Sequence, residues 1–399
     1  MKEKRSKVKP TTSRTKRPLS KKPAATSRST TTGARKKGTP RPSVKPRPAT
    51  TRPAAGSLAE ETQAKLNQLQ DQLGRQQESL LLTSVRDDLE DIATGLTVLP
   101  TEIAGLRTRG YVFRSFLENK INVLTEQWGE THQRVSREVN TRVRGLEREA
   151  DEAEEAMRQA MSGGSTQIAR AESAIKTLER KVSAARSAAQ AMYDTVQQNV
   201  RQTKAQIEQI RWLLDQIDEA SFQLHPAEDP VAACKAQYLE REDEGPEGVL
   251  YLTDERLIFE RKEKVATKKV LFITTEKETV QEFIFDVHIG QVEEATASDK
   301  RKFLKRKEML ELLFAPEADL SGATLRLIDA QNEEWAQLIG RVKSGEIAKE
   351  RTQPKDEAVV EAARAAPTKC PTCGATLSVE IVRGMREINC EYCGSVIRL

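Results

Sequence analysis

The run GVLYLTDERLIF, from Gly248 to Phe259, decides the fold of the middle of this chain. It contains two short apolar stretches rich in β-branched and aromatic residues, which is the composition of half-buried strands. Thr253 and Asp254 lie between the stretches, and both residue types favour a turn. The run therefore predicts a β-hairpin. The residues that we expect to face a core are Leu250, Leu252, Leu257 and Phe259.

Strand patterns continue on both sides of this hairpin. They predict strands near residues 233–240, 248–253, 256–261, 269–274, 281–288, 308–314 and 322–328. The segment from Asn332 to Lys343 then places its apolar residues on one face of a helix. Many strands followed by one helix are typical of an α+β domain, here a sheet or barrel plugged by the helix. We expect this domain to span residues 226–345.

The hairpin also resembles a family signature. An apolar strand that ends in Tyr251-Leu252-Thr253, a polar turn, and then Arg256-Leu257-Ile258-Phe259 are similar to the signature of GRAM domains, a branch of the pleckstrin-homology-like (PH-like) superfold. The resemblance implies a non-catalytic module that binds phosphoinositide-type lipids or protein partners. The acidic run 241–247 stands where PH domains usually carry basic residues, and it would repel a phosphorylated headgroup. Protein binding is therefore the favoured use.

A cluster of basic residues precedes the strand predicted at 308–314. It surrounds Phe303 and Leu304 and could contact an anionic surface, where each basic residue contributes about 1 kcal/mol near a charged leaflet. The alternative is a solvated loop or helix turn without a binding role. The members of this basic cluster are Lys300, Arg301, Lys302, Lys305, Arg306 and Lys307.

Residues 58–225 have a helix-forming composition and an apolar repeat of three and four residues. They predict helices at 58–99, 101–161 and 165–224, which end at Pro100 and at Ser162-Gly163-Gly164. So long a repeat predicts a left-handed coiled coil, and two equally long helices around a short turn predict an antiparallel hairpin. We expect an all-α rod that acts as a spacer and forms homo-oligomers. Its first helix packs on the hairpin or pairs with another chain.

Residues 1–57 carry 18 basic residues and one acidic residue, although the net charge of the whole chain is only +5. They also hold half of the 16 prolines and no aromatic residue, so they cannot bury enough surface to offset the entropy of ordering. We expect a disordered basic tail. It either docks on an anionic partner, which could be DNA, RNA or a membrane surface, or serves only as a solubilising linker.

Four of the five cysteines form two C-x-x-C pairs, each followed by a glycine, and their spacing is typical of a zinc ribbon that spans residues 368–399. The predicted Zn²⁺ ligands are Cys370, Cys373, Cys390 and Cys393. A redox dithiol is the alternative, but the βαβ pattern that it normally accompanies is missing. Four thiolates leave no open position for water, so we expect a structural ion. Strands at 377–381 and 387–389 are expected to pair, and residues 346–367 to form a loose linker.

Motifs of catalysis are missing from the sequence. The three histidines stand far apart, and no phosphate-binding glycine loop occurs. We therefore expect no enzyme, but a multidomain scaffold or adaptor that oligomerises through the coiled coil and docks protein partners through the GRAM-like domain and the ribbon. The alternatives are a nucleic-acid-associated protein that uses the tail, and a peripheral membrane protein that binds anionic lipid.

The cysteine usage and the apolar content also predict the compartment. Paired C-x-x-C units with a single further cysteine do not resemble a disulfide framework, so a reducing compartment fits. No apolar stretch is long enough for a signal peptide or a membrane span. We expect a cytoplasmic protein, with peripheral membrane attachment or association with the nucleoid as alternatives.

Overall fold

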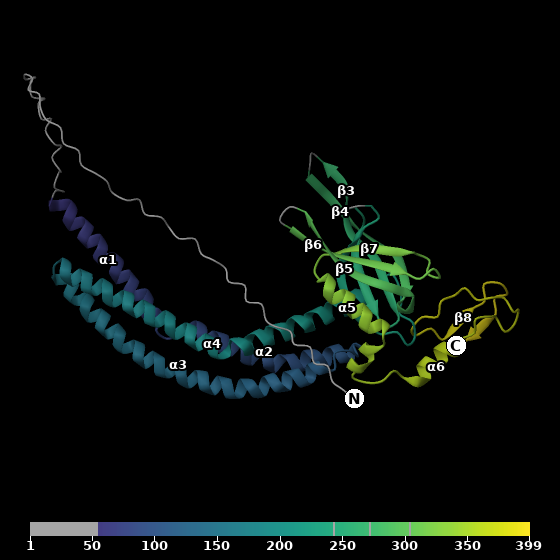
Figure 1. The fold of residues 1–399 in the computed structure, drawn as a ribbon, viewed down its shortest axis with the longest axis horizontal. Helices are drawn as coiled ribbons and strands as arrows, with labels where there is room; N and C mark the ends of the chain where they lie inside the picture. The colour runs from purple at the N-terminus through teal and green to yellow at the C-terminus, as the bar shows by residue number, and fades with distance from the viewer. Residues whose placement is uncertain (1–54, 242–243, 271–272, 303–304) are drawn as a thin grey trace, which may run out of the picture. The chain divides into compact units, whose positions relative to one another are not determined.

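The computed structural model describes residues 55–399 except 242–243, 271–272 and 303–304, and it leaves the side chains of residues 55–58, 264–279 and 300–306 undescribed (Figure 1). The chain divides into two compact units, 1–58 and 59–399, and the description below concerns the second unit and the start of its first helix. The predicted tail lies outside the described residues up to position 54.

From residue 55 onward, four helices precede the sheet: α1 (Ala55–Ser79), α2 (Thr83–Thr108), α3 (Phe116–Ser162) and α4 (Ser165–Asp218). The helix predicted at 58–99 is wrong in two respects. The chain breaks at Leu82, which has a left-handed φ of 48°, and α2 runs on through Pro100. The buried stripe of α2 continues past the proline to Ile103 and Leu106, so packing on the neighbouring helices outweighs the lost hydrogen bond.

Helices α3 and α4 form the predicted hairpin, with the break at Gly163 and Gly164 (Figure 1). Lys181 of α4 pairs with Glu149 of α3, and Lys120 lies 3.3 Å from Gln206, so the two helices run antiparallel. Helix α2 is fixed on α4 by Asp88, whose carboxylate accepts from the Tyr193 hydroxyl at 2.7 Å and from the Gln197 amide at 3.0 Å.

The described residues form one sheet of seven antiparallel strands in the order β4-β3-β2-β1-β7-β6-β5, of which Figure 1 labels β3 to β7. The hairpin predicted from GVLYLTDERLIF is confirmed, because β2 and β3 pair across it and its four core residues are fully buried. Helix α5 (Asn332–Lys343) packs on β5 and β6. The strands are β1 (Pro230–Tyr238), β2 (Glu247–Thr253), β3 (Arg256–Val270), β4 (Ile273–His288), β5 (Val292–Lys302), β6 (Lys305–Phe314) and β7 (Gly322–Leu327).

Two strand predictions are wrong. The strand predicted at 269–274 does not exist as a separate element, because β3 and β4 extend on either side of residues 271–272. Strand β5 was not predicted at all. Its sequence VEEATASDKRK has few apolar residues, so it lacks the alternation that marks a strand, and only its pairing with β6 reveals it.

The end of α4 is joined to the sheet by buried polar contacts. Glu260 of β3 is fully buried and accepts hydrogen bonds from the Tyr251 hydroxyl at 3.0 Å and from the Ser221 N–H at 2.6 Å. The Phe222 ring packs edge-on against Tyr251, with ring centroids 5.0 Å apart. These contacts bind the connection that follows α4 to β2 and β3.

The segment expected as a loose linker contains a short 3₁₀ helix, η2 (Glu346–Glu350), and helix α6 (Glu357–Ala365). A second 3₁₀ helix, η1 (Ile289–Gln291), joins β4 to β5. Downstream, β8 (Glu387–Asn389) pairs with β9 (Val396–Arg398). The pairing predicted between 377–381 and 387–389 is therefore wrong. The second cysteine knuckle folds its own flanks into a hairpin, which closes a shorter loop.

Candidate metal centre and the polar junction beside it

The two C-x-x-C units form two knuckles of the same geometry. In the first, the Gly374 N–H donates to the Cys370 carbonyl at 2.8 Å, and in the second the Gly394 N–H donates to the Cys390 carbonyl at 2.8 Å. Both glycines have a left-handed φ, +73° and +72°, which a residue with a Cβ rarely adopts. Each knuckle thus turns back tightly enough to present two sulfur atoms to one point.

The four predicted ligand residues come together. Their Sγ atoms all lie within 4.8 Å of one another, and the Cys370–Cys393 and Cys373–Cys390 pairs are each 3.7 Å apart. A tetrahedral ion with metal–sulfur bonds of about 2.3 Å places its sulfur atoms about 3.8 Å apart. The cluster therefore has the size of a four-thiolate metal site. Among the described residues it is the only group of three or more side chains that could hold a metal ion.

Ser395 favours the thiolate form of two of these cysteines. Its hydroxyl lies 3.3 Å from the Cys370 Sγ and 3.1 Å from the Cys393 Sγ. These hydrogen bonds lower the pKa of Cys370 to about 5, and they lower the pKa of Cys393 as well. At Cys373 the Ala375 N–H lowers the pKa, but burial and the other three thiols outweigh it and raise the pKa to about 12. The four sulfurs cannot all ionise without a shared cation, which a divalent metal would supply.

A small apolar cluster supports the knuckles. Ile388 and Ile397 face each other across β8 and β9 and are buried together with Cys370 and Cys390, while Leu377, Val379 and Met385 pack against them. So small a core buries little surface, and domains of this size usually depend on a metal or disulfides for stability.

A second group of side chains, which we call the polar junction, lies where α4 leads into the sheet. Its centre is the ion pair of Arg256 and Glu228, whose side chains are 6% and 0% exposed. The Arg256 guanidinium also donates to Asp286 at 2.7 Å and to the Gln223 carbonyl at 3.0 Å. Glu228 in turn accepts from the Thr253 hydroxyl at 2.6 Å. A buried ion pair in which both members have further partners is costly to break on one side.

The segment between the two knuckles docks on this polar junction. The Arg383 N–H donates to the Leu224 carbonyl at 2.7 Å, and its guanidinium binds the Asp229 carboxylate at 3.0 Å. The Glu380 carboxylate lies 2.6 Å from the His225 Nε2 and 3.4 Å from the Arg256 Nη1. Arg383 and Glu380 carry opposite charges. This segment therefore binds both acidic and basic groups of the junction.

The start of the expected linker docks on the other side of the same junction. Arg351, with a side chain only 8% exposed, pairs with Asp229 at 2.5 Å and with Asp254 at 3.1 Å. Lys355 reaches Asp254 at 2.9 Å, and the Thr352 N–H donates to the Val112 carbonyl at 2.8 Å. Residues 351–355 are thus bound to the sheet and to the connection between α2 and α3.

His225 titrates within this network. Its Nδ1 lies 3.3 Å from Glu255 and its Nε2 lies 2.6 Å from Glu380. The hydrogen bond with Glu255 raises the pKa of His225, against the effect of burial, and Glu380 raises it further. The same bond lowers the pKa of Glu255 to about 2. The histidine is therefore held more firmly in its charged form than a free histidine.

The basic cluster predicted at residues 300–307 lies on the β5–β6 hairpin, where a loop or a helix turn was the alternative. In the backbone register Lys300 stands opposite Lys307, Arg301 opposite Arg306 and Lys302 opposite Lys305. The structure describes the backbone of these residues but, except for Lys307, not their side chains. The backbone register thus brings the six residues together on one hairpin. In the sequence this hairpin is distant from the cysteine cluster.

Sequence reasoning missed the polar junction. Arg256 and Thr253 lie inside the hairpin sequence, where the pattern indicates only a turn and a family signature. A signal was present, because an arginine in an otherwise apolar strand needs a buried partner. Its partner Glu228 lies 28 residues away in a proline-containing stretch. Nothing in the spacing connected the two.

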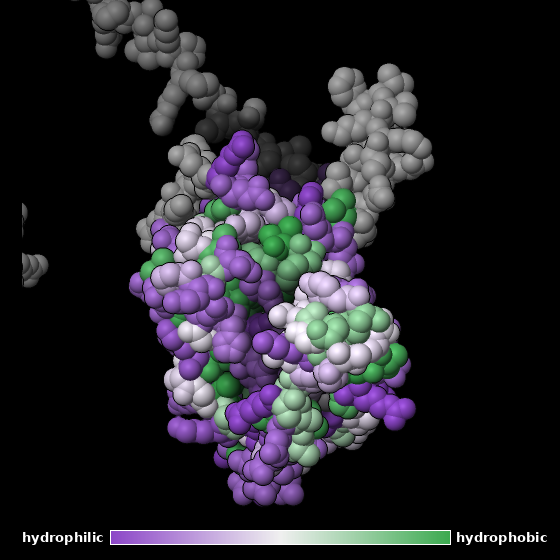
Figure 2. Space-filling model, turned by 90° about the vertical axis from the view of Figure 1, so that its right-hand side faces the viewer, coloured by the Kyte–Doolittle hydropathy of each residue, from purple (hydrophilic) through white to green (hydrophobic). Residues whose placement is uncertain are grey.

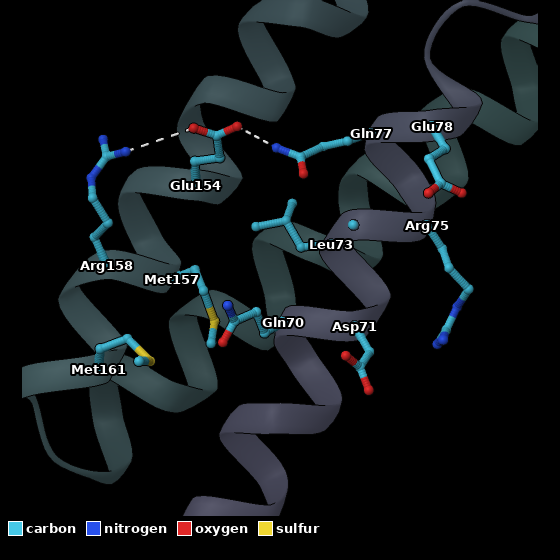
Figure 3. Close-up of a pocket in the computed structure, with 11 residues that line it drawn as sticks. Gln70, Asp71, Leu73, Arg75, Gln77, Glu78, Glu154, Met157, Arg158 and Met161 are labelled. Atoms are coloured by element: carbon cyan, nitrogen blue, oxygen red, sulfur yellow. Dashed lines mark hydrogen bonds and ion pairs between the residues drawn. The ribbon is translucent and has the colours of Figure 1, made fainter.

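Figure 3 shows a pocket of ≈ 660 Å³ between α1 and α3. Leu73 and Met157 from the two helices are buried at its floor, and the Glu154 carboxylate accepts a hydrogen bond from Gln77 and pairs with Arg158 at 3.7 Å. These polar groups satisfy one another across the helix contact. The pocket is therefore an irregularity of helix packing, and we assign no chemistry to it.

The molecular surface offers no large apolar face in the view of Figure 2, where small apolar patches are separated by hydrophilic residues. The second knuckle exposes Tyr392 (73%), and β9 exposes Val396 (58%). Within the part of the chain that the structure describes, no helix is long and apolar enough to cross a membrane.

Comparison with known proteins identifies no family. No family model matches the chain, and no curated protein matches it. Among solved structures, the chain is similar to the N-terminal PH domain of Vps36, with 13% identity over 33% of this chain and 97% of that one, at a TM-score of 0.20. The DH/PH domains of p115-RhoGEF match with 13% identity over 72% and 96% of the two chains, at a TM-score of 0.19.

The DH/PH domain of human ARHGEF11, solved in a complex with human RhoA and its inhibitor, matches with 11% identity over 65% of this chain and 94% of that one, at a TM-score of 0.23. At TM-scores this low, these likenesses carry no argument about the fold or the activity of this chain.

Proposed function

We propose that this protein is a non-catalytic scaffold or adaptor, in which a coiled-coil rod carries a GRAM-like docking domain and a zinc ribbon. The proposal rests mainly on one observation, the docking of the ribbon on the polar junction through Glu380 and Arg383. Through these contacts, two exposed charges of the ribbon meet the partly buried side chains of His225 and Asp229. The cysteine cluster has four ligands and so leaves no position for a reacting water.

The metal of this proposal is zinc. Cys370, Cys373, Cys390 and Cys393 would hold it, and four thiolates in tetrahedral arrangement are the ligand set of structural zinc. When bound, the ion would neutralise the thiolates and stabilise the small ribbon core, with no part in a reaction. Iron is the competing metal for four thiolates, and metal analysis of the purified protein distinguishes the two.

The rod is proposed to set the oligomeric state. Support comes from the apolar repeat and from the exposed apolar residues on the helices, among them Val98, Val123 and Met161. Sedimentation equilibrium of the full chain tests this, with an oligomer of fixed stoichiometry expected. A monomer at micromolar concentration would exclude the oligomerisation rod and leave the docking role to the sheet domain and the ribbon.

A second candidate function is binding to an anionic surface, and the β5–β6 hairpin favours it specifically. Like charges opposite each other on paired strands destabilise a hairpin, by roughly 0.2–1 kcal/mol a pair. Three like-charged pairs stand in succession in the backbone register, which suits an anionic partner. The affinity of such a partner would fall as salt rises.

The alternatives are separated by binding assays with DNA, RNA and anionic liposomes across salt concentrations, on the full chain and on a variant without residues 1–57. Salt-sensitive nucleic-acid binding that disappears with the tail would support the nucleic-acid alternative. Liposome binding that survives the deletion but is lost in Arg301→Glu/Arg306→Glu would support the hairpin. No binding to any of the three would leave the adaptor role alone.

A further inference from the structure

A cleft of ≈ 710 Å³ opens between α4, the first half of β1 and α5. Its volume is in the range of ligand-binding pockets, ~300–1,000 Å³. Trp212 of α4 and Trp335 of α5 both line it, together with Ile210 and Leu338. This cleft contains neither the cysteine cluster nor the polar junction, and nothing above uses it.

One wall of the cleft is an unpaired edge of β1. On the side away from β2, β1 pairs with β7 only at residues 236–238. The Ile328 N–H still donates to the Lys235 carbonyl at 2.9 Å, and the Lys235 N–H donates to the Asp329 carboxylate at 2.8 Å. Beyond this point the chain turns away toward α5. On the side away from β2, the residues of β1 before Lys235 therefore have no strand partner within the described chain.

The register shows which backbone groups are left open. Residues of an antiparallel strand direct their N–H and C=O groups alternately to the two sides. Ala233 therefore directs both groups to the same side as Lys235, toward the cleft. Within the described chain, Ala233 has no strand partner on that side. The Val231 carbonyl, two residues earlier, accepts from the Tyr111 hydroxyl at 3.4 Å. Tyr111 and Asp329 thus bound the open edge.

A cation lies at the same cleft. Arg114 lines it, and its Nη1 atom is buried without a hydrogen-bond partner among the described residues. Arg114 has a φ of 55°, a left-handed value that is uncommon for arginine, and its carbonyl is held by the Arg107 guanidinium at 3.3 Å. A buried donor without an acceptor costs free energy, and a charged acceptor would recover it.

The other cations of the cleft already have partners. Arg341 pairs with Glu350, and the Lys235 ammonium lies over the Trp212 ring, 5.9 Å from its centroid. Among the described residues, the groups left open at the cleft are therefore the Ala233 N–H and C=O, which have no strand partner on this side, and one guanidinium nitrogen of Arg114. Together they complement an extended peptide backbone with a nearby carboxylate.

We propose that this cleft binds a short extended segment of another protein that carries a carboxylate, and that the segment adds a strand to the open edge of β1. Its backbone pairs with Ala233, its carboxylate pairs with Arg114, and alternate side chains contact Trp212 and Leu338. This proposal rests on one part of the proposed adaptor role, namely that the sheet domain docks a protein. If the full-length protein binds its metal and oligomerises but selects no peptide, the peptide site is excluded and the proposed adaptor role is not.

The test uses a phage-displayed library of random heptapeptides, selected on the full-length protein. Enriched sequences should contain Asp or Glu, and a fluorescent synthetic heptapeptide of the enriched sequence should bind at least about tenfold more weakly to Ala233→Pro and to Arg114→Gln. Proline at position 233 removes an N–H that β2 does not use, so the β1–β2 pairing remains. Arg137→Gln, an exposed arginine on α3, is the matched control and should bind as the unmodified chain does.

Hydrogen exchange at single-residue resolution keeps the proposal testable if the proline variant does not fold. In the free protein the Ala233 amide should exchange much faster than the Cys234 amide, which faces β2, and the selected peptide should slow it. The proposal is overturned by a protected Ala233 amide in the free protein, by a selection that enriches nothing, or by peptides that bind both variants like the unmodified chain.

Discussion

At the scale of single residues, the ion pair between Arg256 and Glu228 is the most sensitive point of the molecule. Substituting Arg256→Met leaves the fully buried Glu228 carboxylate without its cation, and we expect a loss of about 3–5 kcal/mol in the free energy of unfolding. Urea denaturation followed by circular dichroism measures this loss. Arg261→Met breaks a pair with Glu263 in which both side chains are only partly buried (30% and 25% exposed), and it is the matched control. Equal losses in the two variants would show that the junction is not a buried network.

His225 makes the junction dependent on pH. Its pKa is raised above 6.5 in the folded chain, so the stability that its charge contributes is complete below pH 6.5 and is lost as the pH rises through the raised value. The pKa of Glu255 is lowered to about 2, so this carboxylate remains charged down to far lower pH. We therefore expect His225→Gln to destabilise the protein more at pH 6 than at pH 8.5.

Thermal unfolding of both forms at the two pH values measures this difference. Glu380→Gln removes one partner of the imidazolium and should reduce the same difference. A destabilisation by His225→Gln that is the same at both pH values would contradict the assignment.

At the scale of elements, the contact of α2 with α4 includes a hydrogen bond from the buried Tyr193 side chain to Asp88. Tyr193→Phe removes the donor to Asp88 while it keeps the buried ring, and we expect a loss of about 1 kcal/mol. Tyr392→Phe, on the exposed second knuckle, is the control and should change the unfolding temperature little. If the two variants unfold at the same temperature, Asp88 does not fix the register of these helices.

The sequence predicted elements well where apolar periodicity was strong. The α3–α4 hairpin and the β2–β3 hairpin needed only the spacing of apolar residues and a break at Gly163 or Thr253. Strand β5 and the continuation of α2 past Pro100 could not be predicted in this way. Strand β5 forms because it pairs with β6, and α2 continues past Pro100 because it packs on α3 and α4. Both contacts involve residues that are distant in the sequence.

The candidate site likewise has one part that the sequence predicts and one part that it does not. Local spacing and two glycines were sufficient to predict the cysteine cluster. The junction joins residues as far apart as His225 and Glu380, and the open edge at Ala233 exists only because β7 ends where it does. Such features follow from the topology, and single-sequence patterns carry no information about them.

At the scale of the whole molecule, we expect metal binding by the four cysteines and docking of the segment between them to depend on each other. The segment that carries Glu380 and Arg383 lies between the two knuckles, so a metal bound by the four cysteines would also shape the segment that docks. Removing the metal with a chelator under reducing conditions should therefore raise hydrogen exchange both in residues 370–399 and at Leu224–Asp229. Faster exchange in the ribbon alone would separate the metal from the docking.

The metal content of the purified full-length chain tests the central claim most directly. We expect elemental analysis in reducing buffer to find one zinc ion per chain, and Cys373→Ser to lose most of it, because a four-thiolate site cannot keep its affinity with three ligands. Zinc well below one ion per chain in the unmodified protein, or full retention of the ion in Cys373→Ser, would contradict the account.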